Sequence, residues 1–483
     1  SPRERNATGE HYWRRSTELT EVSGPARSGP SENSHSLPQH AKLSLWPLVV
    51  AAFFMVSGGT YGTEEIVHGA GYARAILILI LTPVLWSLPT AYMVGELSSA
   101  IPAEGGYYAW VRRGMGNFWG FQEAWLSLAA SIFDMAIYPA LFVAYLIHLF
   151  PWFAKSGRGT VMGIVIVAVC ALLNIAGVRV VATTSLWLFF ALSAPFVLIC
   201  FLAPFRHGEL AHAAHPSAST VGLLGGVLIA MWNYMGWDSA STIATEVDRP
   251  QQIYPRAILL AVLLVSLTYI IPVAAVALTG LSPGAWETGS WADIAGMLGG
   301  DWLRVALVCG GLFSAFGMLN ALVMSYSRLP LAMAQDGMLP PVFARVHPRT
   351  GSPWVAILVC ALGWGACVGL DLERLVTIDI LLTGSSVLLE FAALVALRYR
   401  EPELPRPFRV PGGITGAWLA GACPMLLLTL AAVHGQHETI LGVSALAVGL
   451  LLIVAGMLIY WFSALVRPNG WQIPAREPSP ETD

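Results

Sequence analysis

Several acidic residues lie inside long apolar runs of this sequence, and no lysine or arginine lies at the centre of these runs. The acidic residues are Glu64, Glu65, Asp134, Asp238, Glu246, Asp379 and Glu390, with Glu96 and Glu123 nearer the ends of their runs. An ionised side chain at mid-depth in a bilayer costs about 2.5–3.5 kcal/mol, so each acid needs a structural or functional reason. Carboxylates that face a cavity without a basic partner can bind a cation or carry a proton.

The composition indicates a polytopic membrane protein. The chain has 483 residues, of which 56% are hydrophobic and 11% are charged, and its mean hydropathy is +0.64. Soluble domains carry about 25% charged residues. Residues 1–40 are polar and predict a disordered cytoplasmic tail, residues 41–466 a single membrane domain, and residues 467–483 a second cytoplasmic tail.

Twelve apolar runs approach or exceed the ~20 residues that a helix needs to cross a bilayer. They are residues 43–71, 73–100, 119–150, 159–177, 181–204, 220–247, 254–280, 302–327, 353–370, 375–397, 414–433 and 439–464. An even number of spans places both termini on one side. Arginine and lysine are more frequent in the loops on that side, which predicts cytoplasmic termini for a protein of the plasma membrane.

The first run is interrupted by glycines near its middle. Residues 57–62 read SGGTYG, and the next residues, Thr63, Glu64 and Glu65, are typical of a new helix start. Thr63 can cap that helix, and the two glutamates complement the positive end of its dipole. Irregular backbone survives at membrane depth only where protein or water satisfies it, so this break is a candidate binding site.

The sixth run has a similar interruption. Residues 232–238 read WNYMGWD, and Asp238 or Ser239 can cap a resumed helix. Breaks in spans one and six are the spacing expected when five helices repeat with inverted topology. The alternative is a pair of glycine-containing helices that only pack closely.

Several motifs resemble the amino acid–polyamine–organocation transporter superfamily. Residues 102–110 (PAEGGYYAW), for which we expect an interfacial position with aromatic rings at headgroup level, and residues 246–257 (EVDRPQQIYPRA) are similar to its cytoplasmic loops. Residues 56–65, 133–142 and 388–411 resemble the polyamine-uptake branch. One departure is Ala144, where that branch leads us to expect an acidic residue.

The resemblance implies an all-α polytopic membrane protein with twelve transmembrane helices. Ten of them would form a five-plus-five inverted repeat with broken helices one and six, followed by two C-terminal helices. It also implies secondary active transport of polyamines or other cationic amines by alternating access. An amino acid permease of the same fold, working as a proton symporter or an exchanger, is the alternative.

A polyamine needs carboxylates for its ammonium groups and aromatic faces along its length, whereas an amino acid needs free backbone amides for its carboxylate. The predicted substrate-binding residues surround the two breaks. They are Ser57, Gly58, Gly59, Thr60, Tyr61, Gly62, Glu64, Glu65, Tyr138, Trp232, Asn233, Tyr234, Trp237, Asp238 and Glu246.

Each acid also has a purely structural interpretation. Glu64 and Glu65 can complement a helix dipole, Asp238 can act as a cap, and Asp134 can hydrogen-bond between spans. Glu246 can be an ordinary helix-end acid. Glu390 lies a turn or two from Arg398, which gives it a structural interpretation as well.

We expect proton coupling, with Asp134, Glu246 and Glu390 as candidate carriers. Sodium coupling is the alternative, through Ser325 and Ser327 with carbonyl groups of the first break. No phosphate loop, metalloprotease motif or nucleophile elbow is present, so an enzyme is not predicted. No metal, cofactor or nucleic acid is predicted either, and the expected partners are a small substrate, a proton and the lipid bilayer.

Overall fold

The computed structural model describes residues 43–103, 105–155, 157–208, 210, 223–287, 289–370, 372–435, 439–440 and 443–466. All of them belong to the compact unit that spans residues 42–483. The two predicted tails, residues 1–40 and 467–483, lie outside the described residues.

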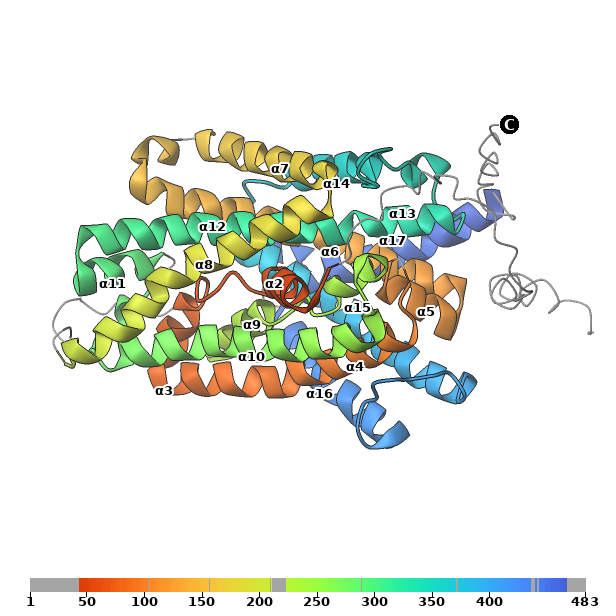
Figure 1. Cartoon of the computed structure of the whole chain (residues 1–483), viewed down its shortest axis with the longest axis horizontal. Helices are drawn as coiled ribbons and strands as arrows, with labels where there is room; N and C mark the ends of the chain where they lie inside the picture. The colour runs from red at the N-terminus through yellow and green to blue at the C-terminus, as the bar shows by residue number, and fades with distance from the viewer. Residues whose placement is uncertain are drawn as a thin grey trace, which may run out of the picture. The chain divides into compact units, whose positions relative to one another are not determined.

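The described chain is almost entirely helical (Figure 1). Its α-helices are α2 (Leu45–Val56), α3 (Glu64–Thr82), α4 (Leu88–Ala100), α5 (Tyr107–Met115), α6 (Asn117–Leu149), α7 (Arg158–Ala176), α8 (Val178–Leu202), α9 (Leu223–Asn233), α10 (Pro250–Ala277), α11 (Ser290–Gly299), α12 (Asp301–Tyr326), α13 (Arg328–Gln335), α14 (Trp354–Ala366), α15 (Leu372–Arg400), α16 (Gly413–Gly435) and α17 (Ala445–Val466). A π-helix, η2 (Pro83–Ser87), joins α3 to α4. Short 3₁₀ helices are η3 (Pro151–Ala154), η4 (Ala203–Arg206), η5 (Ser239–Glu246), η6 (Pro283–Ala285) and η7 (Pro341–Ala344), and β1 (Thr439–Ile440) pairs with β2 (Val443–Ser444).

Within the described residues, nine helical segments are long and apolar enough to cross a membrane. The described residues also form three shorter apolar helices, α2, α9 and α14. Two of the three, α2 and α9, end where the sequence predicts the breaks. Gly71, with φ 73° and ψ 164°, interrupts α3 at the predicted border between the first two spans. The prediction of a polytopic helical membrane protein is therefore confirmed.

The continuation of the sixth run differs from the expected α-helix. It forms the 3₁₀ helix η5, and Ile243 within it has non-helical torsions. The hydroxyl groups of Thr242 and Ser325 both donate to the carbonyl of Ser239, which an α-helix would use for the amide of residue 243. Side-chain hydroxyls thus replace a helical hydrogen bond.

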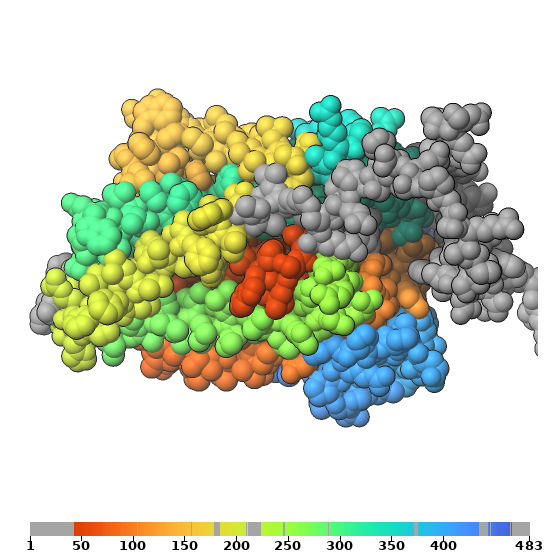
Figure 2. Space-filling model, viewed as in Figure 1, coloured from red at the N-terminus to blue at the C-terminus, as the bar shows by residue number. Residues whose placement is uncertain are grey.

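Helix α12 lies at the centre of the packing and contacts α2, α6, α7, α8 and α11 (Figure 1). It is largely buried, whereas α16 and α17 expose large apolar side chains such as Leu426 and Leu451, as lipid-facing helices do. On the face shown in Figure 2, part of α2 is visible between α8 and α10, which both contact it. The core therefore surrounds the interrupted helix α2.

Helix α5 packs into the protein with its aromatic rings buried, and its position at headgroup level stays a prediction. Tyr107, Tyr108 and Trp110 are fully buried. The Tyr108 hydroxyl donates to Asp336 at 2.8 Å, and Arg112 pairs with the same carboxylate at 2.5 Å. Burial beside this carboxylate raises the pKa of the Tyr108 hydroxyl well above its usual range, so the group remains a donor.

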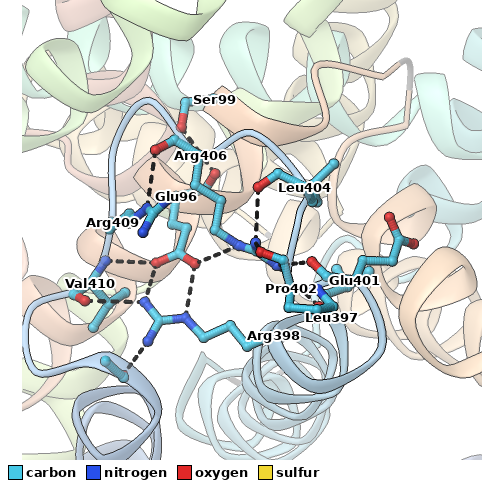
Figure 3. Close-up of polar contacts among 11 residues, drawn as sticks. Glu96, Ser99, Leu397, Arg398, Glu401, Pro402, Leu404, Arg406, Arg409 and Val410 are labelled. Carbon is cyan, nitrogen blue, oxygen red and sulfur yellow. Dashed lines mark hydrogen bonds and ion pairs between the residues drawn. The ribbon is translucent and has the colours of Figure 1, made fainter.

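A buried ion network joins α4 to the segment that follows α15 (Figure 3). Glu96 is fully buried and accepts hydrogen bonds from Arg398 at 2.9 and 2.5 Å and from the Val410 amide at 2.6 Å. Arg406 lies 3.2 Å from the same carboxylate. The Arg398 guanidinium group therefore pairs with α4, and neither Glu390 oxygen has a well-formed hydrogen bond in the described part of the chain.

We predict that Glu96→Ala destabilises the protein by about 3–5 kcal/mol, since it leaves two buried arginines without their counter-ion. Thermal unfolding of the purified protein measures this effect. The matched control is Glu401→Ala, which removes the part-exposed ion pair with Arg113 and should cost less than about 1 kcal/mol. Equal melting temperatures for the two variants would contradict the assigned role of Glu96.

Candidate functional site

The first break begins where α2 ends at Val56. Gly59 and Gly62 have φ values of 79° and 90°, the left-handed region that glycine adopts without steric cost. The Gly59 amide donates to Ser57 Oγ at 3.0 Å. These residues unwind the chain over a short distance before α3 starts at Glu64.

Side chains from other helices satisfy the carbonyl groups of this break. Ser314 Oγ of α12 donates to Gly58 O at 2.5 Å, and Trp291 Nε1 of α11 donates to Thr60 O at 3.2 Å. The Tyr61 hydroxyl donates in turn to Leu307 O at 2.7 Å. The break is thus held by buried protein groups, as irregular backbone inside a membrane requires.

Glu64 fixes the start of α3. Its buried carboxylate accepts hydrogen bonds from the Gly62 amide at 2.6 Å, the Tyr145 hydroxyl at 2.9 Å and the Gly289 amide at 3.3 Å. Thr63, the expected cap, donates instead to Thr60 O and makes no capping bond. The expected cap is therefore wrong, and Glu64 instead binds the Gly62 amide just before the helix.

The second break follows α9 and turns at Gly236, which has a φ of 93°. Asn233 Nδ2 donates both to Ile229 O at 2.9 Å and to Gly62 O at 3.2 Å, so one side chain links the two breaks. The Asn233 carbonyl accepts the Tyr269 hydroxyl at 2.8 Å. Asp238 precedes η5 but makes no side-chain capping bond.

A small cavity lies where the two breaks meet α6, α12 and α15. Its volume is about 30 Å³, enough for one or two water molecules. The lining residues are Met55, Val56, Gly58, Tyr61, Asp134, Tyr138, Leu141, Trp232, Asn233, Met235, Gly236, Ser314, Met318, Tyr326, Asp379 and Thr383. Of these described residues, two are acidic and none is basic.

Hydroxyl groups hold both carboxyl groups of the cavity. Asp134 accepts the Tyr138 hydroxyl at 2.6 Å and the Tyr326 hydroxyl at 3.4 Å. Asp379 accepts Thr383 Oγ1 at 2.9 Å. The rings of Tyr138 and Trp232 stack with centroids 6.5 Å apart. The cavity therefore combines negative charge with aromatic faces, which suits a cation.

The sequence also has clear relatives. A family model described as amino acid permease matches residues 49–455. The chain belongs to the amino acid permease family. This result confirms the resemblance to the amino acid–polyamine–organocation superfamily.

The relatives of this permease include polyamine transporters and an amino acid exchanger. The permease is 34% identical over 443 residues to a probable polyamine transporter of Arabidopsis thaliana, covering 91% of both chains. It is 34% identical over 424 residues to the polyamine transporter PUT1 of Oryza sativa subsp. japonica, covering 86% of this chain and 78% of the relative. The serine/threonine exchanger SteT of Bacillus subtilis is 26% identical over 356 residues, covering 71% of this chain and 79% of the relative.

The permease brings six predicted site residues to the cavity: Gly58, Tyr61, Asp134, Tyr138, Trp232 and Asn233. Five others, Ser57, Gly59, Thr60, Gly62 and Glu64, shape the first break behind it. The Tyr234 hydroxyl donates to Leu79 O at 3.0 Å, and Trp237 is buried outside the lining.

Three further acids do not line the cavity. Asp238 and Glu390 meet in a separate buried cluster, and Glu65 is half-buried on α3. The Glu246 side chain lies outside the described residues.

The sequence prediction missed the contribution of α12. Ser314, Met318 and Tyr326 line the cavity, and the closely spaced Gly310, Ser314 and Gly317 let the interrupted helix approach. This small-residue spacing is visible in the sequence but is equally typical of ordinary helix packing. Ser325, proposed for sodium with the first break, bonds to Ser239 O of the second break at 2.9 Å instead.

We predict that Gly236→Ala destabilises the permease. A Cβ there would lie 2.6 Å from Met55 O, and the left-handed torsion alone costs about 1–2 kcal/mol. The matched control is Gly363→Ala in α14, where a Cβ would meet no atom within 4 Å. Thermal unfolding should show a lower melting temperature for Gly236→Ala only. A loss of the same size in both variants would count against the close approach of the two breaks.

Proposed function

We propose that this permease is a secondary active transporter of polyamines or other cationic amines and that it has no enzymatic activity. The observation that supports this function best is the cavity with two carboxyl groups, Asp134 and Asp379, and no basic lining residue. An ammonium group would lie between these carboxylates, and the faces of Tyr138, Trp232 and Tyr61 would contact its alkyl chain.

Transport of amino acids is the alternative function. An amino acid carboxylate would need the free amides of the first break. However, Glu64 already occupies the Gly62 amide, and Ser57 occupies that of Gly59. The protein's own carboxylate therefore stands where a substrate carboxylate would bind. The polyamine transporters among the relatives also share more identity with this chain than the exchanger does.

We also propose the finer topology implied by the breaks. The nine long segments, together with α2, α9 and α14, would make twelve crossings. Gly71 would divide the first long segment, whose first part would join α2, while η5 would join α9 and α14 would form a crossing of its own. Spans one to five and six to ten would then form the inverted repeat, with α16 and α17 after it. Both termini would face the cytoplasm at the plasma membrane.

We propose proton coupling, with Asp134 as the first candidate carrier and Glu246 and Glu390 as the others. Asp134 and Asp379 are close enough for their charges to interact. Two neighbouring carboxyl groups tend to share a proton, and a bound ammonium group would replace it. Asp134 is also held by two tyrosine hydroxyls that can follow its change of charge.

We expect radiolabelled putrescine and spermidine to accumulate in proteoliposomes under an inward proton gradient without sodium. Asp134→Asn and Asp379→Asn should each lower kcat/KM by about tenfold or more, because each removes one charge-assisted contact of about 1.5–3 kcal/mol. The control is Asp301→Asn on the exposed start of α12. Displacement of the label by unlabelled leucine, or no accumulation at all, would support the amino acid alternative.

The role of Glu64 can be tested separately by Glu64→Gln. If the carboxylate only orders the break, the maximal rate falls by a similar factor for every substrate, since the amide cannot accept all three hydrogen bonds. If it binds an ammonium group, as the sequence predicts, KM rises for cationic substrates. We expect the first result, with Glu65→Gln as the matched control.

A further inference from the structure

A second group of buried carboxyl groups lies outside the cavity lining. It consists of Glu123 on α6, Asp238 before η5 and Glu390 on α15, with exposed fractions of 0%, 6% and 0%. Ser386 Oγ donates to Glu123, and Ser127 Oγ lies 3.0 Å from Ser386 Oγ. Asp238 and Glu390 lie close enough to interact directly. We call these three carboxyl groups the lower acidic cluster.

Several buried oxygen atoms of the lower acidic cluster have no hydrogen-bond donor among the described residues. No well-formed hydrogen bond satisfies either oxygen of Glu390, Oε2 of Glu123 or Oδ1 of Asp238. The fully buried Tyr107 hydroxyl also lacks such a partner, and it lies within charge-interaction range of all three acids. Unpaired buried polar atoms are costly, so this concentration points to a ligand with several donors.

A metal ion is not the ligand that this arrangement favours. No three His, Cys, Asp or Glu side chains in the described part of the chain converge closely enough to hold one. An ammonium group needs longer and less regular contacts than a metal ion. The ammonium group supplies N–H donors, and the unpaired carboxylate oxygens of the cluster can accept hydrogen bonds from them.

The helix register relates the lower acidic cluster to the cavity. Helices α6 and α15 pack against each other (Figure 1). Along α6, Glu123, Ser127 and Asp134 are separated by steps of four and seven residues. Along α15, Glu390, Ser386 and Asp379 are separated by the same steps in the reverse direction. The serine contact fixes this antiparallel register. Glu123 thus lies level with Glu390, and Asp134 lies level with Asp379.

The two acidic levels are three helical turns apart. Eleven residues at about 1.5 Å per residue separate them by roughly 16–17 Å. Between the levels, the Tyr326 hydroxyl donates to Asp134 at 3.4 Å. Asp238 lies within charge-interaction range of Asp379, and Tyr107 within that of Tyr326. Tyr326 and Gly236, which lies two residues before Asp238, also line the cavity.

We propose that the lower acidic cluster binds the far ammonium group of a long polyamine whose near ammonium group lies between Asp134 and Asp379. This inference rests on the proposed function and specifies its substrate class. An extended chain advances by about 1.25 Å per single bond. Spermine, with thirteen bonds between its terminal nitrogens, therefore spans about 16 Å, which matches the separation of the levels. Putrescine, with five bonds, spans about 6 Å and reaches one level only.

The test compares spermine and putrescine uptake by the full-length protein in proteoliposomes. Glu123→Gln should raise the spermine KM by about tenfold and change the putrescine KM by less than about twofold. The matched control is Glu403→Gln, which removes one exposed charge just beyond α15 and should change neither value. Equal effects on the two substrates, or no effect on either, would overturn the proposal.

A second measurement uses the unmodified protein and so does not depend on the folding of a variant. Unlabelled α,ω-diamines of increasing length compete with labelled spermidine for uptake. Competition should strengthen about tenfold as the nitrogen separation reaches roughly 16 Å, and monoamines of equal length should show no such gain. If competition instead increased smoothly with chain length for both diamines and monoamines, the gain would come from apolar burial alone. That result would overturn the proposed second binding site. Failure of the wild-type protein to take up or bind any polyamine would instead refute the proposed function itself.

Discussion

The structure depends on satisfying the backbone groups of two unwound segments at membrane depth. Water is scarce there, and an unpaired carbonyl or amide costs several kcal/mol. The carbonyls of Gly58, Thr60 and Gly62 accept donors from α12, α11 and α9, and the Gly62 amide binds Glu64. These long-range bonds fix where α9, α11 and α12 lie around the first break. The cavity is a consequence of that arrangement.

The buried acids fall into two groups by the donors that reach them. Glu96 receives two guanidinium groups and an amide, and Glu64 receives two amides and a hydroxyl. Their charges are compensated within the protein. Hydroxyl groups donate to Asp134 and Asp379, and none of the described residues around them in the cavity is basic. Glu390 has no well-formed hydrogen bond within the described part of the chain. The second group keeps the capacity to accept a cation or a proton, which is how structural and functional acids differ in this fold.

The sequence predicts the local features well because they depend on neighbouring residues. The glycine-rich break at Gly58 and the interruption near Gly236 were located from composition and spacing alone. Partners distant in the chain were not predictable. Arg398 bonds to Glu96 rather than to the nearer Glu390, and the rings of α5 are buried although their sequence is amphipathic. Ser314 and Tyr326 reach the cavity only because α12 crosses the break.

The amide of Asn233 has a mechanical consequence. One nitrogen donates to Ile229 O of its own helix and to the carbonyl of Gly62, so α9 supplies a donor that the first break needs. If either segment rotated without the other, the Gly62 carbonyl would lose this hydrogen bond in a region that contains little water. A molecule that displaces either segment would therefore also disturb a hydrogen bond of the other.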